Sequence, residues 1–211
     1  MKIVKQSVEL LWITPEAENQ IEQVGRTCYK SEDRITEDSH GPFCRKMVDN
    51  GHHAMIEHAS ASFLIITDRG VSHEIVRHRI ASFAQESTRY CNYSADKFGG
   101  EIAVVEPPGL GEGRKSSYYD VEEPRDIWKS ACSFAEMQYR KLLGKGCSPQ
   151  IARSVLPTCL KTEIVMTANF REWRHFITLR RAKAAHPQIR EIAEYVLSVL
   201  KIQAPNVFYD L

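Results

Sequence analysis

The chain has 211 residues, of which 43% are hydrophobic, and this allows one large domain or two small ones with a buried core. Its formal net charge is only +1, whereas proteins that live on nucleic acid or on anionic membranes usually carry a strong basic bias. No apolar stretch approaches the ~18 residues that a membrane helix requires, and the chain does not open like a signal peptide. We therefore expect a cytoplasmic protein that binds neither nucleic acid nor membranes.

Cysteine and linker patterns point to a single reduced domain. The six cysteines form no C-x-x-C pair and are too sparse for a disulfide framework, so they are expected to be thiols. No linker rich in Pro, Gly or Ser divides the chain, and the one loose stretch runs from Pro107 to Ser117. These features predict one domain over residues 1–211.

The first fifty residues predict one strand and two helices. Residues 2–13 alternate loosely and are rich in Val, Leu and Ile, which predicts a strand. The pair Thr14-Pro15 is typical of a capping residue and a proline in the first helical turn, so a helix is expected over residues 15–29. A second helix is expected over residues 42–50, ending at Gly51.

A buried strand and a basic helix are expected next. The apolar run from Ala59 to Thr67 is too continuous for a strand with one wet face, so we expect a central strand. Asp68 is expected to cap the helix that follows. At 3.6 residues per turn, Arg77 and Arg79 would lie about 200° apart on that helix and so reach toward two different ligands.

The second half begins with a short strand and a long helix. Residues 102–105 predict the strand, and residues 122–143 predict a helix. The side chains expected on the core-facing stripe of this helix are Ile127, Ala131, Phe134, Ala135, Gln138 and Leu142. Ser148-Pro149 is expected to open a short helix that carries Arg153.

The last third predicts a strand followed by two helices. Residues 161–168 alternate, with Ile164, Met166 and Ala168 on one face, as in a half-buried strand. Asn169 is expected to cap a helix that reaches Arg180. A final helix opens at a proline, and its apolar stripe is Ile189, Ile192, Ala193, Val196, Val199 and Leu200.

The segment from Arg77 to Tyr90 carries chemistry that a hydrophobic core does not need. It holds three arginines, a histidine, a glutamine, a glutamate and small hydroxyl residues within fourteen positions. Permanently charged guanidinium forks among hydroxyl donors suit phosphate or carboxylate. The segment therefore predicts a binding site for a phosphorylated small molecule, and a solvated basic loop is the plain alternative.

The same segment resembles the flavin-dependent thymidylate synthases. Arg77-His78-Arg79, followed after seven residues by Ser87, is the signature of that family. The resemblance extends in family order to the blocks at residues 51–58, 152–157 and 169–180. It implies an α+β fold with one mixed or mainly antiparallel sheet and packed helices, in agreement with the order of the expected elements.

The resemblance also implies the site residues. The residues matching the deoxyuridylate (dUMP) contacts of the family are Glu74, Arg77, Glu86, Ser87, Thr88, Arg89, Arg153 and Arg180. Those matching its FAD contacts are His52, Ala54, Arg77, His78, Arg79, Gln85, Asn169, Phe170, Arg171 and His175. Arg180 and Ser87 take the catalytic positions, with Arg180 favouring the anion of ring nitrogen 3 by a fixed positive charge.

The implied reaction is the reductive methylation of dUMP to dTMP. Methylenetetrahydrofolate supplies the carbon, NADPH reduces FAD, and the active sites are shared between the subunits of a homotetramer. Two alternatives stay open, another FAD- or nucleotide-dependent oxidoreductase and a nucleic-acid-binding module, and the near-neutral charge disfavours the second.

Several positions depart from the family pattern or leave their role open. Ala54 stands where a hydroxyl residue is often found, and Ala184 stands where many relatives have a histidine, with His186 the nearest substitute. Cys91 lies two residues after an expected substrate contact, although the family gives it no catalytic role. His53 and Glu57 share a helical spacing but match no zinc signature, so no metal site is expected.

Overall fold

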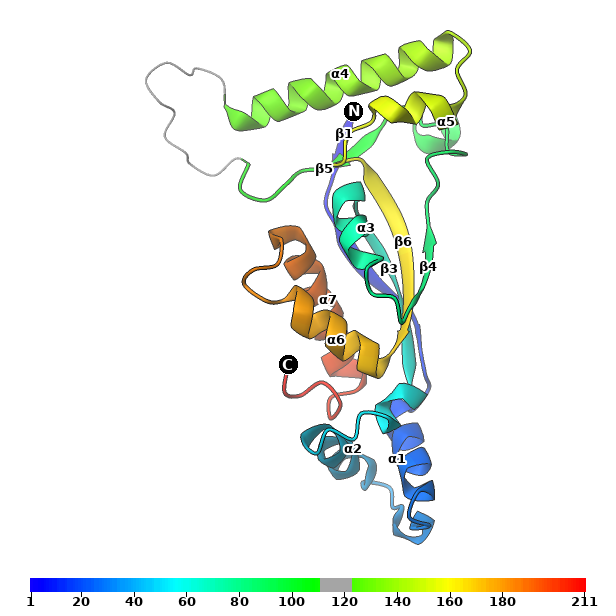
Figure 1. Cartoon of the computed structure of the whole chain (residues 1–211), viewed down its shortest axis with the longest axis vertical. Helices are drawn as coiled ribbons and strands as arrows, with labels where there is room; N and C mark the ends of the chain where they lie inside the picture. Colours follow the sequence, from blue (N-terminus) through cyan, green and yellow to red (C-terminus); the bar gives the residue numbers. More distant parts are fainter. Residues whose placement is uncertain (111–122) are drawn as a thin grey trace. The chain divides into compact units, whose positions relative to one another are not determined.

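The computed structural model describes residues 1–110 and 123–211 and shows strands and helices mixed along the chain (Figure 1). The strands are β1 (Lys2–Val4), β2 (Ser7–Ile13), β3 (Ser60–Asp68), β4 (Ser82–Gln85), β5 (Ala103–Val105) and β6 (Lys161–Asn169). The helices are α1 (Ala17–Thr27), α2 (His40–Asp49), α3 (Arg69–Ile75), α4 (Pro124–Gly144), α5 (Pro149–Ala152), α6 (Phe170–Arg180) and α7 (Pro187–Gln203). Short 3₁₀ turns lie at Glu32–Arg34, Met55–His58, Asp96–Phe98 and Arg153–Val155.

The strands form a four-stranded sheet in the order β2-β3-β6-β4 and a separate parallel pair of β1 and β5. The main chain shows that β3 and β6 are antiparallel: Arg69 N donates to Leu160 O at 3.0 Å, and Phe170 N donates to Ala59 O at 2.8 Å. Moving forward on one strand therefore means moving backward on the other. The expected α+β fold with a mainly antiparallel sheet is confirmed, and β3 is a central strand as predicted.

The chain is divided into two compact units, each built from three separate stretches. The first unit comprises Met1–Gln6, Ile66–His73 and Gln85–Ile164, and the second comprises Ser7–Ile65, Glu74–Ala84 and Val165–Leu211. Strands β3 and β6 each contribute to both units. One domain over residues 1–211 stays a prediction.

The core of the second unit forms where α6 and α7 pack on the sheet. Trp173 of α6 is fully buried and meets Phe63 of β3 edge-on, with ring centroids 5.0 Å apart. Its indole N–H donates to Ala61 O at 3.0 Å, which satisfies its one polar atom in the core. Phe176 packs on the same indole at 5.5 Å. Helix α6 is thereby fixed on the strand that precedes the Arg77 segment.

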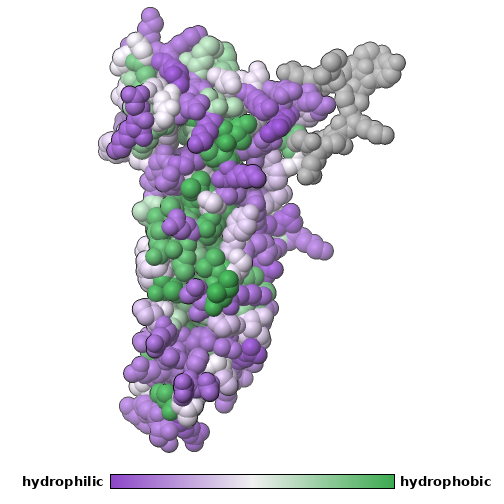
Figure 2. All heavy atoms as spheres, turned by 180° about the vertical axis from the view of Figure 1, so that it is seen from behind, coloured by the Kyte–Doolittle hydropathy of each residue, from purple (hydrophilic) through white to green (hydrophobic). Residues whose placement is uncertain are grey.

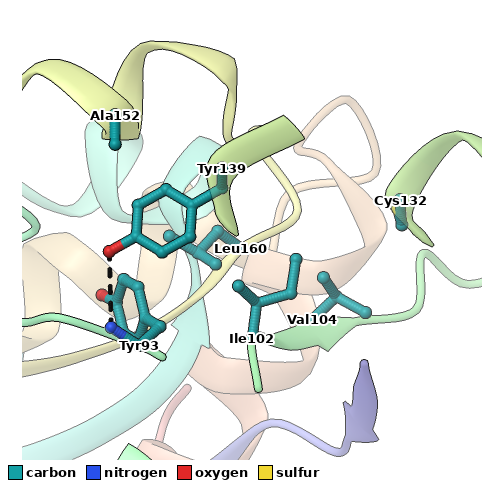
Figure 3. Packing of buried hydrophobic residues seen from close by; sticks show 7 residues of the cluster. All are labelled: Tyr93, Ile102, Val104, Cys132, Tyr139, Ala152 and Leu160. Atoms are coloured by element: carbon teal, nitrogen blue, oxygen red, sulfur yellow. Dashed lines mark hydrogen bonds between the residues drawn. The ribbon is translucent and has the colours of Figure 1, made fainter. Parts of the chain in front are cut away.

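The core of the first unit lies between α4, β5 and the start of β6 (Figure 3). Its buried members are Tyr93, Ile102, Val104, Cys132, Tyr139, Ala152 and Leu160. The hydroxyl of Tyr139 accepts a hydrogen bond from the backbone N–H of Tyr93 at 3.4 Å, so the phenol keeps a polar partner. The sulfur atoms of Cys132 and Cys159 lie 3.4 Å apart at the edge of this core, and both residues are thiols.

Several sequence predictions are confirmed in detail. The carboxylate of Asp68 accepts from Val71 N at 2.7 Å, and Asn169 Oδ1 accepts from Glu172 N at 2.9 Å, so both residues cap helices. Gly51 ends α2 with a φ of 69°, a conformation that glycine adopts without steric cost. The apolar stripe of α7 is buried, with Val199 only partly so.

Two predictions near the start of the chain are wrong. The strand expected over residues 2–13 is broken at Lys5 and Gln6, and its halves β1 and β2 belong to different sheets. Thr14 does not cap α1; its hydroxyl instead accepts from Ser60 N at 2.9 Å and donates to Ser60 O at 3.3 Å. The Thr14 hydroxyl therefore bonds to the backbone of Ser60 on β3, and not to the start of α1 as the sequence predicted.

The expected core stripe of α4 is also wrong. Ile127, Ala131 and Phe134 are exposed, and the buried residues of the helix are Cys132, Glu136 and Tyr139. Glu136 is buried because it accepts from Ile102 N at 3.1 Å and pairs with the terminal ammonium of Met1 at 2.9 Å. The first residue expected for this helix, at position 122, and the part of the Pro107–Ser117 stretch from residue 111 onward lie outside the described residues. Within the described part of the chain, no helix has both the length and the apolarity to cross a membrane.

Candidate functional site

A cavity of about 780 Å³ lies in the second unit, within the size range of small-molecule sites. Three stretches of chain build it: the turn before β3, the segment after α3, and α6 with its capping residue. Its lining residues are His53, Glu57, Arg77, His78, Arg79, Ile80, Asn169, Arg171, Glu172, Arg174, His175 and Thr178. Its wall is thus rich in guanidinium and imidazole groups and holds two carboxylates.

The arginines of this cavity differ in whether their guanidinium groups are paired with a carboxylate of the protein. Arg174 is buried and holds Asp210 through two contacts of 2.7 and 2.6 Å, so its charge is neutralised within the fold. Arg171 pairs with Glu57 at 2.6 Å. Within residues 1–110 and 123–211, the exposed guanidinium groups of Arg77 and Arg79 have no hydrogen-bond or ion-pair partner. Two uncommitted cations at a cavity suit an anionic ligand.

His78 is the buried centre of a hydrogen-bond chain beside these arginines. Its Nδ1 lies 3.0 Å from Glu172 Oε1, and its Nε2 accepts from the Nε–H of Arg180 at 3.0 Å. Burial lowers the pKa of His78 below its ordinary value and the charge of Arg180 lowers it further, whereas Glu172 acts in the opposite direction. The imidazole is therefore neutral at neutral pH.

Arg180, the last residue of α6, is held at all three nitrogen atoms. Besides the bond to His78, its NH1 donates to Glu74 Oε2 at 3.1 Å and its NH2 donates to Glu74 O at 2.8 Å. Its side chain is 14% exposed, so the guanidinium is mostly withdrawn from water. A fixed, poorly hydrated cation is the arrangement that stabilises negative charge developing on a bound substrate.

His78, Glu172 and His175 each bring one candidate metal-ligand atom, and these atoms lie within 4.8 Å of one another. Both nitrogens of His78 are already hydrogen-bonded, one of them to the cation of Arg180. A metal ion here would displace a contact and approach a positive charge. The group is better suited to holding a proton than to holding a metal.

The first unit carries the remaining five of the eight expected dUMP residues, around Glu86. Lys161 donates to Glu86 Oε2 at 3.1 Å and also contacts Glu163, while Tyr93 OH donates to Glu86 Oε1 at 2.8 Å. Burial alone would lower the pKa of Lys161, but the hydrogen bonds and charges of both glutamates raise it overall. Lys161 is thus an ammonium that holds Glu86 in place.

The hydroxyl residues after Glu86 lie beside two arginines. Thr88 Oγ1 accepts from Arg153 NH1 at 2.9 Å, and Ser87 Oγ accepts from Arg89 N at 3.3 Å. Arg89 donates from its Nε to Gln150 at 3.0 Å and is otherwise exposed. Both guanidinium groups therefore keep further donors for a phosphate.

The structure separates the expected residues by unit. Those of the second unit that line the cavity or bond to a lining residue are Glu74, Arg77, His78, Arg79, Asn169, Arg171, His175 and Arg180. Those of the first unit are Gln85, Glu86, Ser87, Thr88, Arg89 and Arg153. The amide of Gln85 donates to Ser72 at 2.8 Å and to Thr162 at 3.1 Å, so it is committed within that unit.

Three expected FAD residues of the second unit do not line the cavity. The side chain of Phe170 is fully buried and packs on Phe208 at 5.3 Å, so it is a core residue. His52 and Ala54 are exposed, and His53 between them lines the cavity. The expected helical placement of Arg77 and Arg79 is wrong, because α3 ends at Ile75 and both arginines lie in the turn beyond it. They line one cavity and do not diverge from a helix.

Sequence reasoning missed Glu172, Arg174 and Lys161. The spacing of Asn169 and Glu172 is that of a capping box, in which the acid reaches back to the first helical turn. In the structure the Glu172 carboxylate turns to His78. The signal that could have pointed to Glu172 is its buried partner His78, which belongs to the signature.

Residues 9–206 match the family model Thy1, described as thymidylate synthase complementing protein. A flavin-dependent thymidylate synthase of Geobacter sulfurreducens is 34% identical over 210 residues, which cover 96% of this chain and 85% of the relative. The protein of that name from Corynebacterium glutamicum is 35% identical over 204 residues, covering 92% and 79%.

A solved structure is similar over nearly the whole chain. The UMP/dUMP methylase PolB from Streptomyces cacaoi, crystallised with 5-Br dUMP, is 26% identical to this chain. The TM-score is 0.78, and the match covers 99% of this chain and 96% of PolB.

Proposed function

Because the chain belongs to the Thy1 family of thymidylate synthase complementing proteins, we propose that it converts dUMP to dTMP by reductive methylation. The named relatives and the dUMP-methylase neighbour support this reaction over the two alternatives left open by the sequence, another flavin oxidoreductase and a nucleic-acid-binding module. The observation that carries the proposal is the juxtaposition of the cavity with the held cation of Arg180. Together they supply an anionic-cofactor site and a charge for the pyrimidine.

The electron balance requires a reductant besides the carbon donor. Methylenetetrahydrofolate donates carbon at the oxidation level of formaldehyde, and a methyl group requires two more electrons. NADPH is the proposed source, and FAD, when bound, supplies them to the transferred carbon as a hydride. The products are then dTMP, tetrahydrofolate and NADP⁺.

The residues of the cavity fit FAD. A dinucleotide brings a pyrophosphate and a flat ring system, and the uncommitted guanidinium groups of Arg77 and Arg79 suit the first. The imidazole of His175, the amide of Asn169 and the guanidinium of Arg171 offer donors and flat faces for the second. We assign these five residues to the cofactor.

For dUMP, we assign the phosphate to Ser87, Arg89 and Arg153, and the ring to Arg180. Raising electron density at carbon 5 of uracil is easier once nitrogen 3 is an anion, and a fixed cation favours that anion. Glu74 sets the plane of the guanidinium through two hydrogen bonds.

We further propose a homotetramer in which one copy supplies the Ser87–Arg89 set and another supplies the Arg180 set. Figure 2 shows hydrophobic residues gathered on one face of the molecule, as expected of a surface that another copy covers. Large exposed apolar side chains of the second unit include Leu11, Trp12 and Ile80. A cytoplasmic location stays a prediction, which the unpaired state of the cysteines supports.

The proposal is tested on the purified protein in two steps. Its visible absorption spectrum is recorded before and after anaerobic addition of NADPH, and dTMP and the folate product are then measured after addition of dUMP and methylenetetrahydrofolate. Flavin bleaching, dTMP and tetrahydrofolate are expected. Bleaching without dTMP would identify a flavin reductase, and a colourless protein that cannot be loaded with FAD would overturn the proposal.

Subunit sharing is tested by mixing two inactive variants, Arg153→Ala and Arg180→Ala. If different copies supply the two sets, mixed oligomers contain some sites with both arginines intact, and activity returns. Recovery is expected after co-refolding the two variants and not after simple dilution of either. No recovery in mixed oligomers of demonstrated composition would place both sets in one copy.

A further inference from the structure

Two hydrogen bonds connect Glu172, in the first turn of α6, to Arg180, its last residue, through the side chain of His78 from outside the helix. Glu172 and Arg180 lie eight residues apart, so they do not touch directly along the helix. His78, in the segment after α3, fills the space between them with contacts of 3.0 Å on both sides. The imidazole is also enclosed by Phe176, at a ring distance of 4.9 Å.

Counting donors and acceptors fixes where the proton of His78 must be. Arg180 carries only donors, so for as long as its Nε stays 3.0 Å from His78 Nε2, that nitrogen has to accept and carries no hydrogen. A neutral imidazole with a bare Nε2 holds its proton on Nδ1, and that proton faces the Glu172 carboxylate. In the other tautomer an Nε2–H would point at the Nε–H of Arg180, and Nδ1 would face a carboxylate with no hydrogen between them.

Burial makes this arrangement matter energetically. The side chains of His78 and Glu172 are 2% and 8% exposed, so water cannot replace a lost partner. A buried polar group without a hydrogen-bond partner destabilises the fold, and this cost is avoided here only if Glu172, His78 and Arg180 keep one arrangement of donors and acceptors. The orientation of Arg180 therefore depends on an acceptor beside His78 Nδ1.

The same count shows what the arrangement leaves for a substrate. A guanidinium has five N–H donors, and the contacts to His78 and Glu74 use one on each nitrogen. One N–H remains on each terminal nitrogen. Two donors in one rigid plane match an adjacent anionic nitrogen and carbonyl oxygen on a ring edge.

We propose that Glu172 is a positioning residue for the methylation step: it fixes the tautomer of His78, and His78 together with Glu74 then holds the Arg180 guanidinium in the plane that the pyrimidine requires. This inference rests on the proposed role of Arg180 at the ring. What it adds is that the Glu172 carboxylate, which need not touch the substrate, controls the orientation of the Arg180 guanidinium.

The experiment compares Glu172→Gln with Glu172→Leu. The amide oxygen of glutamine still accepts from Nδ1–H, so Glu172→Gln should keep kcat within about threefold. Leucine has no acceptor, and misplacing a catalytic group by about 1 Å lowers rates about a hundredfold, so Glu172→Leu should lower kcat for dTMP about 10- to 100-fold. Flavin content and NADPH-dependent flavin reduction should change less than about threefold in both, because those steps do not need the ring anion.

The matched control is Glu22→Leu. Glu22 is also a buried glutamate of the second unit, but its partners are Arg26 and Ser39. Its replacement should lower stability and leave kcat per folded site unchanged. Equal losses of kcat in Glu22→Leu and Glu172→Leu would reduce the role of Glu172 to general stability and overturn the proposal.

A readout independent of activity is the tautomer itself. In protein labelled with ¹⁵N-histidine, one imidazole should show a protonated Nδ1 and a bare Nε2, and its signal should be missing in His78→Gln. Glu172→Gln should keep this signal, and Glu172→Leu should convert it to the Nε2–H form. A change of tautomer without loss of methylation would overturn the positioning role, although the hydrogen-bond assignment would stand. Loss of methylation with the tautomer unchanged would overturn the positioning role.

If Glu172→Leu does not fold, the pair His78→Gln and His78→Leu decides. A glutamine amide can donate to Glu172 and accept from Arg180 at once, whereas leucine does neither. His78→Gln should exceed His78→Leu at least tenfold in dTMP formed per bound flavin. Equal activities would overturn the proposal.

Discussion

The two units treat their charged residues in different ways. In the second unit, a line of hydrogen bonds runs from Glu172 through His78 and Arg180 to Glu74, beside a cavity of about 780 Å³. In the first unit, Glu86 is equally well held, but the guanidinium groups of Arg89 and Arg153 are exposed. On the proposed assignment of ligands, this difference means that the cation at the pyrimidine ring is fixed in advance. The phosphate, which is charged on every side, can be bound by cations that adjust to it.

Arg180→Ala is the strongest test of this contrast. A fixed cation at a developing charge is worth about 3–4 kcal/mol, so methylation should fall roughly a hundredfold or more. FAD should stay bound, and stopped-flow reduction of the flavin by NADPH should survive. The adjacent Arg181→Ala removes an arginine paired with Glu194 and should leave both steps unchanged. Joint loss of flavin and methylation in Arg180→Ala would mean that Arg180 holds the cofactor or the fold.

Arg79→Ala and Arg89→Ala separate the two sites. A charged hydrogen bond contributes about 1.5–3 kcal/mol, so Arg79→Ala should weaken FAD binding roughly 10- to 100-fold in a flavin titration. Arg89→Ala should raise the KM for dUMP by a similar factor and leave FAD binding unchanged. If either variant moved both quantities equally, the division of ligands between the units would be wrong.

Asp210→Asn tests the committed arginine of the cavity. It leaves the buried guanidinium of Arg174 without its carboxylate, so the free energy of unfolding should fall by about 1–3 kcal/mol at neutral pH. The hydrogen bond from Arg174 holds the pKa of Asp210 below its usual range. The stabilisation is therefore present above the unfolded-state pKa of about 3.9 and is lost as pH falls through the folded-state pKa.

Urea unfolding at pH about 7 and at pH below about 4 measures this difference, which should shrink in acid. The control is Asp126→Asn in the first unit, whose exposed carboxylate lies 3.8 Å from Lys129. Its effect should stay within about 0.5 kcal/mol at both pH values. A difference for Asp210→Asn that does not depend on pH would refute the ion-pair explanation.

Cys91→Ala should have the smallest effect. The proposed mechanism uses no thiol, so turnover should stay within about tenfold, or about 1.4 kcal/mol in barrier. The serine variant is the matched control for side-chain size. Abolished dTMP formation with FAD still bound would establish a cysteine nucleophile in the first unit.

The sequence predicted helices and strands best where all apolar side chains of an element face the same hydrophobic core. The apolar stripe of α7 and the alternation of β6 each face a single core, and both predictions are confirmed. The face of α4 could not be predicted, because its buried Glu136 is stabilised by Met1 and Ile102, which are distant in sequence. Hydropathy places such a glutamate outside, and only the fold supplies its partners.

The site was predictable to the extent that it is carried by the signature. Arg77 and Arg79 were proposed from their residue types and the signature, and Arg180 from the resemblance, but none of these predicted how the three are arranged. Helical periodicity placed the first two on opposite faces, and it failed because α3 ends two residues earlier. Glu172 was missed because local spacing explains it as a cap, whereas its buried partner is 94 residues away.

The passage of β3 and β6 through both units has a consequence for how the protein is made. Neither unit is a continuous stretch of sequence, so no single cut of the gene yields one of them as an independently expressed fragment. The first unit is complete only when residue 6 meets residue 67 and residue 69 meets residue 160, and the second unit only when residue 59 meets residue 170. Contacts between distant positions slow folding, because a long loop has to close before any of them forms. Because β6 contributes to both units, neither unit of a newly synthesised chain can complete its fold before β6 has left the ribosome. Both units should then fold in one late, cooperative event.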